Sequence, residues 1–247
     1  MLSEWTKLRT TSSFWWTSLL ALVFSLGSTI LVAALDNPDF PTYGGAMAVA
    51  GFSTFGLMTL IIQAIMVATT EYRFKVNSTN FTLTPTRWQV ALSKLLVYGL
   101  YAAVFSFVTI LLCFIVGDLI AANPIEWTDN PFVNRSLWAI PLSTFLAVML
   151  AQGIGWIVRA TAGAIAIYLG WQLVLEPSLA LIPRFGRDIQ TYAPFTNLTY
   201  FMQNFQNPGA EPGVSEPLSL WASFGLFAVW AVVLYIIGVL ILERRDA

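Results

Sequence analysis

Long apolar runs dominate the chain, and polar stretches interrupt them at intervals. A helix that crosses the hydrocarbon core of a bilayer needs about 20 apolar residues. Six runs satisfy this length, at residues 13–35, 46–69, 95–117, 137–158, 161–183 and 218–242. They are continuous rather than alternating, which argues against a transmembrane barrel built from strands of about ten residues. The pattern predicts an all-α integral membrane protein with six transmembrane helices.

Of the polar segments that precede or separate these runs, three bear on the predicted architecture. Residues 1–13 precede the first run, residues 71–94 separate the second from the third, and residues 184–217 separate the fifth from the sixth. The stretch 192–205 is too aromatic for a disordered linker, which predicts that it folds back onto the outer membrane face. No repeat or soluble domain is evident, so we expect residues 1–247 to form a single transmembrane domain.

The amino-acid composition is typical of a membrane protein and excludes several kinds of catalytic and metal-binding site. Hydrophobic residues make up 57% of the chain and charged residues only 10%, far from the averages of soluble domains. There is no histidine and Cys113 is the sole cysteine, which excludes a His/Cys zinc site, a Ser-His-Asp triad and an internal disulfide. No phosphate-binding loop is present, so we expect no catalytic or metal residues, no directly bound cofactor and no nucleic-acid partner.

The basic residues orient the predicted helices. Placing the N-terminus in the cytoplasm puts nine of the twelve Lys and Arg residues on the cytoplasmic side, as the positive-inside rule favours. Those nine are Lys7, Arg9, Arg73, Lys75, Arg87, Lys94, Arg159, Arg244 and Arg245, and the other three are Arg135, Arg184 and Arg187. Six spans then bring both termini to the cytoplasm and make residues 71–94 a cytoplasmic segment.

Residues 71–94 form an unusually long connection for two neighbouring helices of a bundle, which are commonly joined by about 2–8 residues. Thr86 and Gln89 have the spacing of a capping box, which predicts a helix that starts near Arg87. We expect Lys94 to extend its ammonium group toward the lipid headgroups. These features leave two interpretations open, a docking surface for a partner and an ordinary solvated loop.

Four stretches carry a resemblance to a known family. They are SEWTKLRTTSSFWW at the N-terminus, TTEYRFKVNSTNFTLTPTRWQVALSK after the second run, WQLVLEPSLALIP followed by QTYAPF, and the final LERRDA. In this order they resemble the permease subunits of ABC-2 type (type V) ATP-binding-cassette exporters, especially small actinobacterial ones. The resemblance implies an N-terminal interfacial elbow helix, a cytoplasmic coupling helix between spans two and three, and extracellular re-entrant helices between spans five and six.

The resemblance also implies a complex in which this chain is not itself an enzyme. Two copies of an ABC ATPase subunit would bind ATP and Mg²⁺, and a second permease, identical or homologous, would complete the assembly in a bacterial cytoplasmic membrane. The implied ATPase-coupling residues are Glu71, Tyr72, Arg73, Phe74, Lys75, Phe81 and Leu83. The implied elbow residues are Glu4, Trp5, Lys7 and Arg9.

Polar residues within spans one, two and five, which resemble the central helices of the family's dimer, are candidates for a translocation pathway or its gate. They are Ser25, Ser28, Thr29, Gln63, Gln172 and Glu176. Gln63 and Gln172 can equally serve as hydrogen-bonding links between helices. Glu176 is followed by Pro177, which leaves open an extracellular gate and a structural helix break.

The resemblance, with the apolar and aromatic character of the spans, favours export of a lipophilic molecule such as a drug, an antibiotic or a lipid by ATP-driven alternating access. Two alternatives stay open. One is an ion-extruding, for example sodium-extruding, member of the same family, for which Glu176 is the candidate intramembrane ionisable group. The other is an integral-membrane enzyme that modifies lipid, although such an enzyme would need clustered acids, histidines or serines at one interface.

Overall fold

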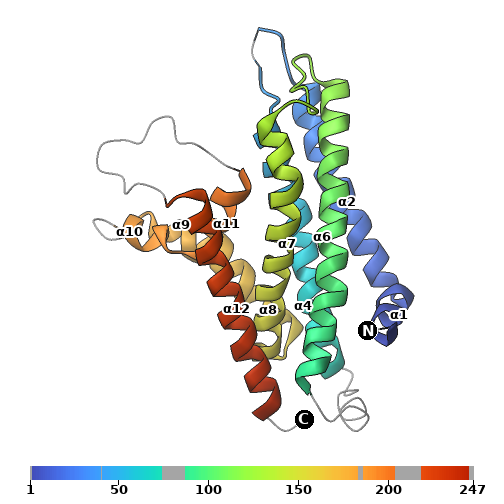
Figure 1. The fold of residues 1–247 in the computed structure, drawn as a ribbon, viewed down its shortest axis with the longest axis vertical. Helices are drawn as coiled ribbons and strands as arrows, with labels where there is room; N and C mark the ends of the chain where they lie inside the picture. The colour runs from blue at the N-terminus through green and yellow to red at the C-terminus, as the bar shows by residue number, and fades with distance from the viewer. Residues whose placement is uncertain (1, 40, 74–86, 183–185, 204–217, 245–247) are drawn as a thin grey trace.

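The computed structural model describes residues 2–39, 41–73, 87–182, 186–203 and 218–244. Within these ranges the structure is helical and contains no β-strand. Long helices form a bundle, and shorter helices lie at its side and at one end (Figure 1). The all-α prediction is confirmed for the described part of the chain.

Five helices of the described residues are long and apolar enough to cross a membrane. They are α2 (Ser12–Ala34), the continuous helix Gly45–Thr70, α6 (Arg87–Ile120), α7 (Pro131–Val158) and α12 (Leu220–Arg244). The second of them contains α3 (Gly45–Gly51), a π-helical turn η1 (Phe52–Gly56) and most of α4 (Leu57–Arg73). These helices match five of the six predicted spans. The chain is a multi-pass membrane protein.

The remaining predicted span, residues 161–183, is not among these five helices. It is built from α8 (Thr161–Gly170), a second π-helical turn η2 (Trp171–Leu175) and α9 (Glu176–Leu179). Gln172, Glu176 and Pro177 reduce its hydropathy, which explains why length and composition alone do not identify it as a span. In Figure 1, α8 starts at the end of the bundle where α12 finishes.

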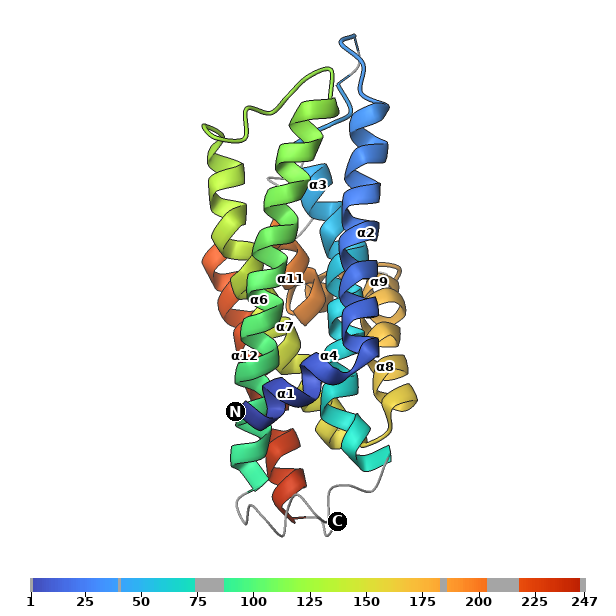
Figure 2. The ribbon, with the colours of Figure 1, turned by 90° about the vertical axis from the view of Figure 1, so that its right-hand side faces the viewer.

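Short helices occupy two of the three polar segments. Helix α1 (Leu2–Thr10) covers most of the predicted elbow segment and crosses the bundle obliquely at its lower end (Figure 2). Helices α10 (Gly186–Thr191) and α11 (Pro194–Gln203) lie where re-entrant helices are expected. No membrane is present in the structure, so the interfacial and re-entrant positions stay predictions.

Helix α7 forms the centre of the bundle, with α4, α6 and α12 packed around it. The most apolar part of α7 is 61% buried, against 28–39% for the other four membrane-crossing helices. Glycines allow the closest contacts: a Cβ on Gly153 would lie 2.8 Å from the backbone of Leu234 in α12, and one on Gly155 would lie 3.0 Å from Ala68 in α4. Small residues at helix contacts are typical of membrane bundles, where close backbone approach replaces the hydrophobic effect.

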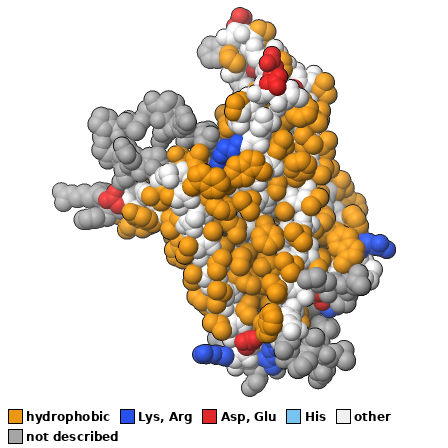
Figure 3. Space-filling model, viewed as in Figure 1, with side chains coloured by type: hydrophobic (Ala, Val, Ile, Leu, Met, Phe, Trp, Pro, Cys, Tyr) orange, Lys and Arg blue, Asp and Glu red, His pale blue; other side chains and the backbone are white. Residues whose placement is uncertain are grey.

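Basic residues gather at one end of the bundle. The start of α6 with Arg87, the α7–α8 turn with Arg159, and the end of α12 with Arg244 all lie at the lower end in Figure 1. Hydrophobic side chains cover most of the face between the ends (Figure 3). The basic residues predicted to share one side of the membrane thus share one end of the molecule, as far as the described residues extend.

Candidate functional site

At the lower end, helix α1 is joined to the bundle by an ion pair between a buried lysine and a partly buried glutamate. Lys94 on α6 is 4% exposed, and its Nζ lies 3.2 Å from Glu4 Oε2 on α1. The same ammonium group donates to the carbonyl of Val67 on α4, at 3.3 Å. Lys94 therefore does not extend to the headgroups as expected. It connects α1, α4 and α6 because α1 returns across the bundle and places a carboxylate beside it.

Glu4 stays ionised in this position. Burial by itself would raise the pKa of Glu4, but the charge of Lys94 and the hydrogen bond from Lys7, whose Nζ lies 2.9 Å from Glu4 Oε1, outweigh burial and lower the pKa below its ordinary value. The predicted elbow residues Trp5 and Arg9 are exposed, while the Arg9 carbonyl accepts a hydrogen bond from Trp15 Nε1 at 2.9 Å. Of the four predicted elbow residues, Glu4 and Lys7 thus belong to the ion-pair cluster.

A second set of hydrogen bonds ties α2 to α4 and α6 above this ion pair. Gln63 Nε2 donates to the carbonyl of Phe14 at 3.0 Å, and the single hydroxyl hydrogen of Tyr98 is shared between Gln63 Oε1 at 3.0 Å and the Leu60 carbonyl at 2.8 Å. Gln63 is only 4% exposed. Its amide acts as a link between helices in this conformation, which is the second of the two roles that the sequence left open.

Two arginines hold the lower end of α12. Arg87 at the start of α6 donates to the Leu242 carbonyl at 3.1 Å, and Arg159 in the α7–α8 turn donates to the Ile241 carbonyl at 3.3 Å. The last carbonyls of a helix have no partner within the helix and carry partial negative charge, so cations stabilise them. Helix α6 is therefore connected both to α1, through Lys94, and to α12, through Arg87, while α4 is connected to α1 and α6 through Lys94.

The predicted ATPase-coupling residues lie at the border of this region. Glu71, Tyr72 and Arg73 belong to the last turn of α4, although their side chains are outside the described part. Phe74, Lys75, Phe81 and Leu83 lie outside the described residues altogether. Helix α6 is described from Arg87 onward, and Thr86 of the predicted capping box lies outside the described residues.

The predicted pathway residues on α2 pack toward the adjacent helix Gly45–Thr70. Ser25 and Thr29 are buried, and the hydroxyls of Ser25, Ser28 and Thr29 donate to carbonyls of their own helix. Ser25 Oγ lies against Gly56 and Ser28 Oγ against Gly51, where a Cβ would come within 2.3 Å of each oxygen. The π-helical turn η1 thus packs directly on this serine face.

Glu176 has a well-defined partner at the upper end of its helix. Its carboxylate is 2% exposed and accepts hydrogen bonds from the backbone N–H of Phe195 at 3.0 Å and of Thr196 at 2.7 Å, and from Thr196 Oγ1 at 3.0 Å. These two N–H groups belong to the first turn of α11, whose amides have no partner within the helix. The carboxylate is therefore the N-terminal cap of α11, supplied by a different helix.

The π-helical turn η2 explains how Glu176 reaches α11 together with an aromatic neighbour. The N–H of Glu176 donates to the Trp171 carbonyl, five residues earlier, so residues 171 and 176 come close to the same side of the widened helix. Trp171 packs edge-on against the Phe195 ring, with 5.8 Å between centroids. Gln172, between them, is partly buried. Neither the π-helical turn nor the cap is visible in the sequence, because the cap is made by backbone groups.

The upper end is closed by two loops that carboxylates organise. Asp36 accepts hydrogen bonds from the backbone of Thr42, Tyr43 and Asn123, at 2.7, 3.0 and 2.7 Å. These bonds, led by that from Tyr43, lower the pKa of Asp36 to about 2. Asp36 thereby joins the loop after α2 to the loop after α6, a role that the sequence did not indicate.

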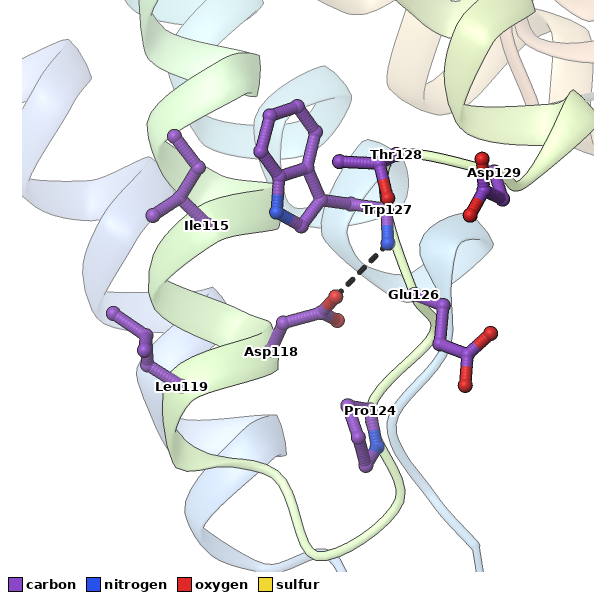
Figure 4. Close-up of a pocket in the computed structure, with 8 residues that line it drawn as sticks. All are labelled: Ile115, Asp118, Leu119, Pro124, Glu126, Trp127, Thr128 and Asp129. Atoms are coloured by element: carbon purple, nitrogen blue, oxygen red, sulfur yellow. Dashed lines mark hydrogen bonds between the residues drawn. The ribbon is translucent and has the colours of Figure 1, made fainter.

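A pocket of about 380 Å³ lies beside these loops. Asp118 points from α6 toward the loop and accepts the backbone N–H of Trp127 at 3.0 Å, while Glu126 and Asp129 add two more carboxylates to the lining (Figure 4). Asp118 also accepts the N–H of Ile125 at 2.9 Å, so its carboxylate shapes the loop. No cluster in the described residues has the three or more ligands that a metal site needs.

Comparison with known proteins identifies a family. A family model described as ABC-2 family transporter protein matches residues 1–171, which is more than half of the chain. The matched range runs from α1 to the start of η2 and ends before Glu176 and α11. No curated protein matches the chain.

Proposed function

This chain belongs to the ABC-2 family of transporter proteins, and from that premise we propose that it is the permease subunit of an ATP-binding-cassette exporter in a bacterial cytoplasmic membrane. Two copies of a separate ATPase subunit hydrolyse ATP with Mg²⁺, and a second permease, identical or homologous, completes the complex. Its substrate is a lipophilic small molecule that leaves the cytoplasm or the inner leaflet. Helices α8, η2 and α9 form the fifth of six spans, so that both termini are cytoplasmic.

The observation that carries this proposal, besides the family, is the connectivity of the lower end. Residues 71–94 join α4 to α6, and Lys94 links both helices to α1 through Glu4 and the Val67 carbonyl. A push on the segment by an ATPase would therefore move α1, α4 and α6 together, as a rigid-body transition requires. The segment from Glu71 to Leu83 is the proposed contact with the ATPase.

The proposed pathway lies along α2, the helix Gly45–Thr70 and the fifth span, formed by α8, η2 and α9. Ser25, Ser28 and Thr29 become accessible when α2 separates from η1, because the tight contacts of Ser25 and Ser28 with Gly56 and Gly51 hold that face closed in the present conformation. Glu176 and Gln172 lie at the outer part of the route, where the capped helix α11 serves as a gate.

Purification of the tagged full-length chain from its native membrane tests this function. The proposal expects an ABC ATPase subunit in stoichiometric amount and ATP hydrolysis that responds to lipophilic compounds. A monomer that purifies alone and modifies lipid would support the enzyme alternative, and ATP-dependent sodium flux in vesicles without movement of lipophilic compounds would support the ion-extruding alternative. Either result would overturn the proposed substrate class, and the first would overturn the transporter role itself.

A further inference from the structure

Helix α11 meets a charged side chain of opposite sign at each end. The Glu176 carboxylate accepts hydrogen bonds from its first turn, as described above. At the other end, Arg135 Nη2 on α7 donates to the carbonyl of Phe201, which lies in the last turn, at 2.6 Å. The guanidinium group also lies 4.6 Å from the centre of the Phe201 ring and 5.9 Å from that of Trp138.

This arrangement matches the electrostatics of a helix. The N-terminus of a helix carries about half a positive charge and its C-terminus about half a negative charge, so an anion at the first turn and a cation at the last turn both stabilise it. The effect is larger where the groups are partly buried, and hydrogen bonds to charged groups are stronger than neutral ones. Helix α11 has both charges in their favourable positions.

The two charges come from different parts of the bundle. Glu176 belongs to the helix α8–η2–α9, whereas Arg135 belongs to the central helix α7. Helix α11 has 10 residues and spans about 15 Å, so the two side chains act on each other through the helix rather than by direct contact. Helix α11 also packs against α12 and touches α3, the upper part of the helix that contains η1.

We propose that Glu176 and Arg135 clamp α11 from its two ends as a single rigid body, and that Arg135 is a positioning residue of the outer gate. Neutralising either charge loosens the whole helix and not merely the end that the charge contacts. The gating role rests on the proposed function, whereas the clamp is a property of this chain. An experiment can therefore disprove the clamp without disproving the proposed export function, and the reverse is also possible.

Cysteine accessibility tests the clamp in membrane vesicles that contain the full-length chain. Cys113 is replaced by alanine, and single cysteines are placed at two buried positions, Ala193→Cys beside the first turn of α11 and Met202→Cys in its last turn. Labelling by a water-soluble maleimide is then measured in the parent, in Glu176→Gln and in Arg135→Gln. Ala91 on α6 is 0% exposed. A cysteine at this position, Ala91→Cys, therefore reports whether the rest of the bundle is folded.

The clamp predicts that each neutral variant raises the labelling rate at both positions by about tenfold, as loss of one charged hydrogen bond would allow. Glu176→Asp and Arg135→Lys keep the charge and should retain most of the protection, while the cysteine at position 91 stays unlabelled. If Glu176→Gln raised labelling only at position 193 and Arg135→Gln only at position 202, the two ends of α11 would be independent. This result would overturn the proposal. Equal labelling of Arg135→Lys and Arg135→Gln would also overturn it, because charge would then not be the cause.

Discussion

Glu4 and Lys94, which are far apart in the sequence, form an ion pair with 3.2 Å between Oε2 and Nζ. Lys94 is buried, and its ammonium group also binds the Val67 carbonyl. The N-terminal helix α1 is thus attached to both helices that flank residues 74–86. This attachment makes α1 part of the lower end of the bundle rather than a separate anchor.

Replacing Glu4 with glutamine should destabilise the protein by about 2 kcal/mol, because the buried Lys94 ammonium group loses its carboxylate. Thermal unfolding of the purified protein in detergent measures the change. Lys7→Gln is the matched control, since it removes only the more exposed partner of Glu4 and should cost less than about 0.5 kcal/mol. Equal unfolding temperatures for Glu4→Gln and Lys7→Gln would show that the buried pair does not stabilise this end.

The membrane-crossing helices could be predicted from the sequence, whereas the partners of the buried charged residues could not. Five of the spans were predictable because a run of apolar side chains specifies a membrane-crossing helix without reference to the rest of the chain. The partners of Lys94 and Glu176 were not predictable in the same way. A lysine at the end of a span normally extends to the headgroups, and only the return of α1 across the bundle gives it Glu4.

At the candidate gate, the sequence indicated an unusual residue, Glu176, but not the groups that bind it. The sequence identified Glu176 as unusual because an acid within an apolar run is costly, but the groups that satisfy it are backbone amides of Phe195 and Thr196. Because nearly every residue has a backbone N–H group, the residue types do not indicate which of these groups will bind the carboxylate. Arg135 was missed for a similar reason, since its partner is the Phe201 carbonyl.

The glycine at the contact of α7 with α12 provides a test of close helix packing. Gly153→Ala should cost about 1–3 kcal/mol, because its Cβ would lie 2.8 Å from backbone atoms of Leu234 and Tyr235, which cannot move aside as a flexible side chain could. Gly225→Ala on α12 meets nothing within 4 Å and should be neutral or slightly stabilising through its helix propensity. Unfolding in detergent distinguishes the two, and a Gly153→Ala protein as stable as the parent would show that α7 and α12 are less closely packed.

The loops at the upper end of the bundle should respond to acid through Asp36. Its pKa in the folded protein is about 2, below the ordinary value of 3.8, so its bonds stabilise the closed loops fully above pH 4 and are lost as the pH falls through 2. Limited proteolysis of the loops by an acid-stable protease between pH 4 and 2 should show accelerating cleavage in the parent. Asp36→Asn cannot accept the same set of hydrogen bonds and should be cleaved quickly at every pH in this range.

Asp39→Asn is the control for this experiment, because the Asp39 carboxylate accepts no hydrogen bond from the residues that the structure describes. It should follow the parent at each pH. If Asp36→Asn also followed the parent, the bonds from Thr42, Tyr43 and Asn123 would not control the opening of these loops.

The proposed link to an ATPase gives the last prediction. Replacing both Glu71 and Arg73 with alanine should reduce export of a lipophilic compound by about tenfold in vesicles, while ATP hydrolysis by the copurified complex continues. The physical reason is that these residues are on the last turn of α4, which Lys94 ties to α1 and α6, so a weaker contact there transmits less motion to the bundle.

Arg244→Ala is the matched control, because Arg244 lies at the same end of the molecule, on α12, but outside residues 71–94. It should leave both export and hydrolysis close to those of the parent. Equal amounts of the three proteins in the membrane must accompany the transport data, so that loss of insertion is not mistaken for loss of coupling. Export at the parental rate by the double variant would place the ATPase contact elsewhere and would remove the mechanical role proposed for the end of α4.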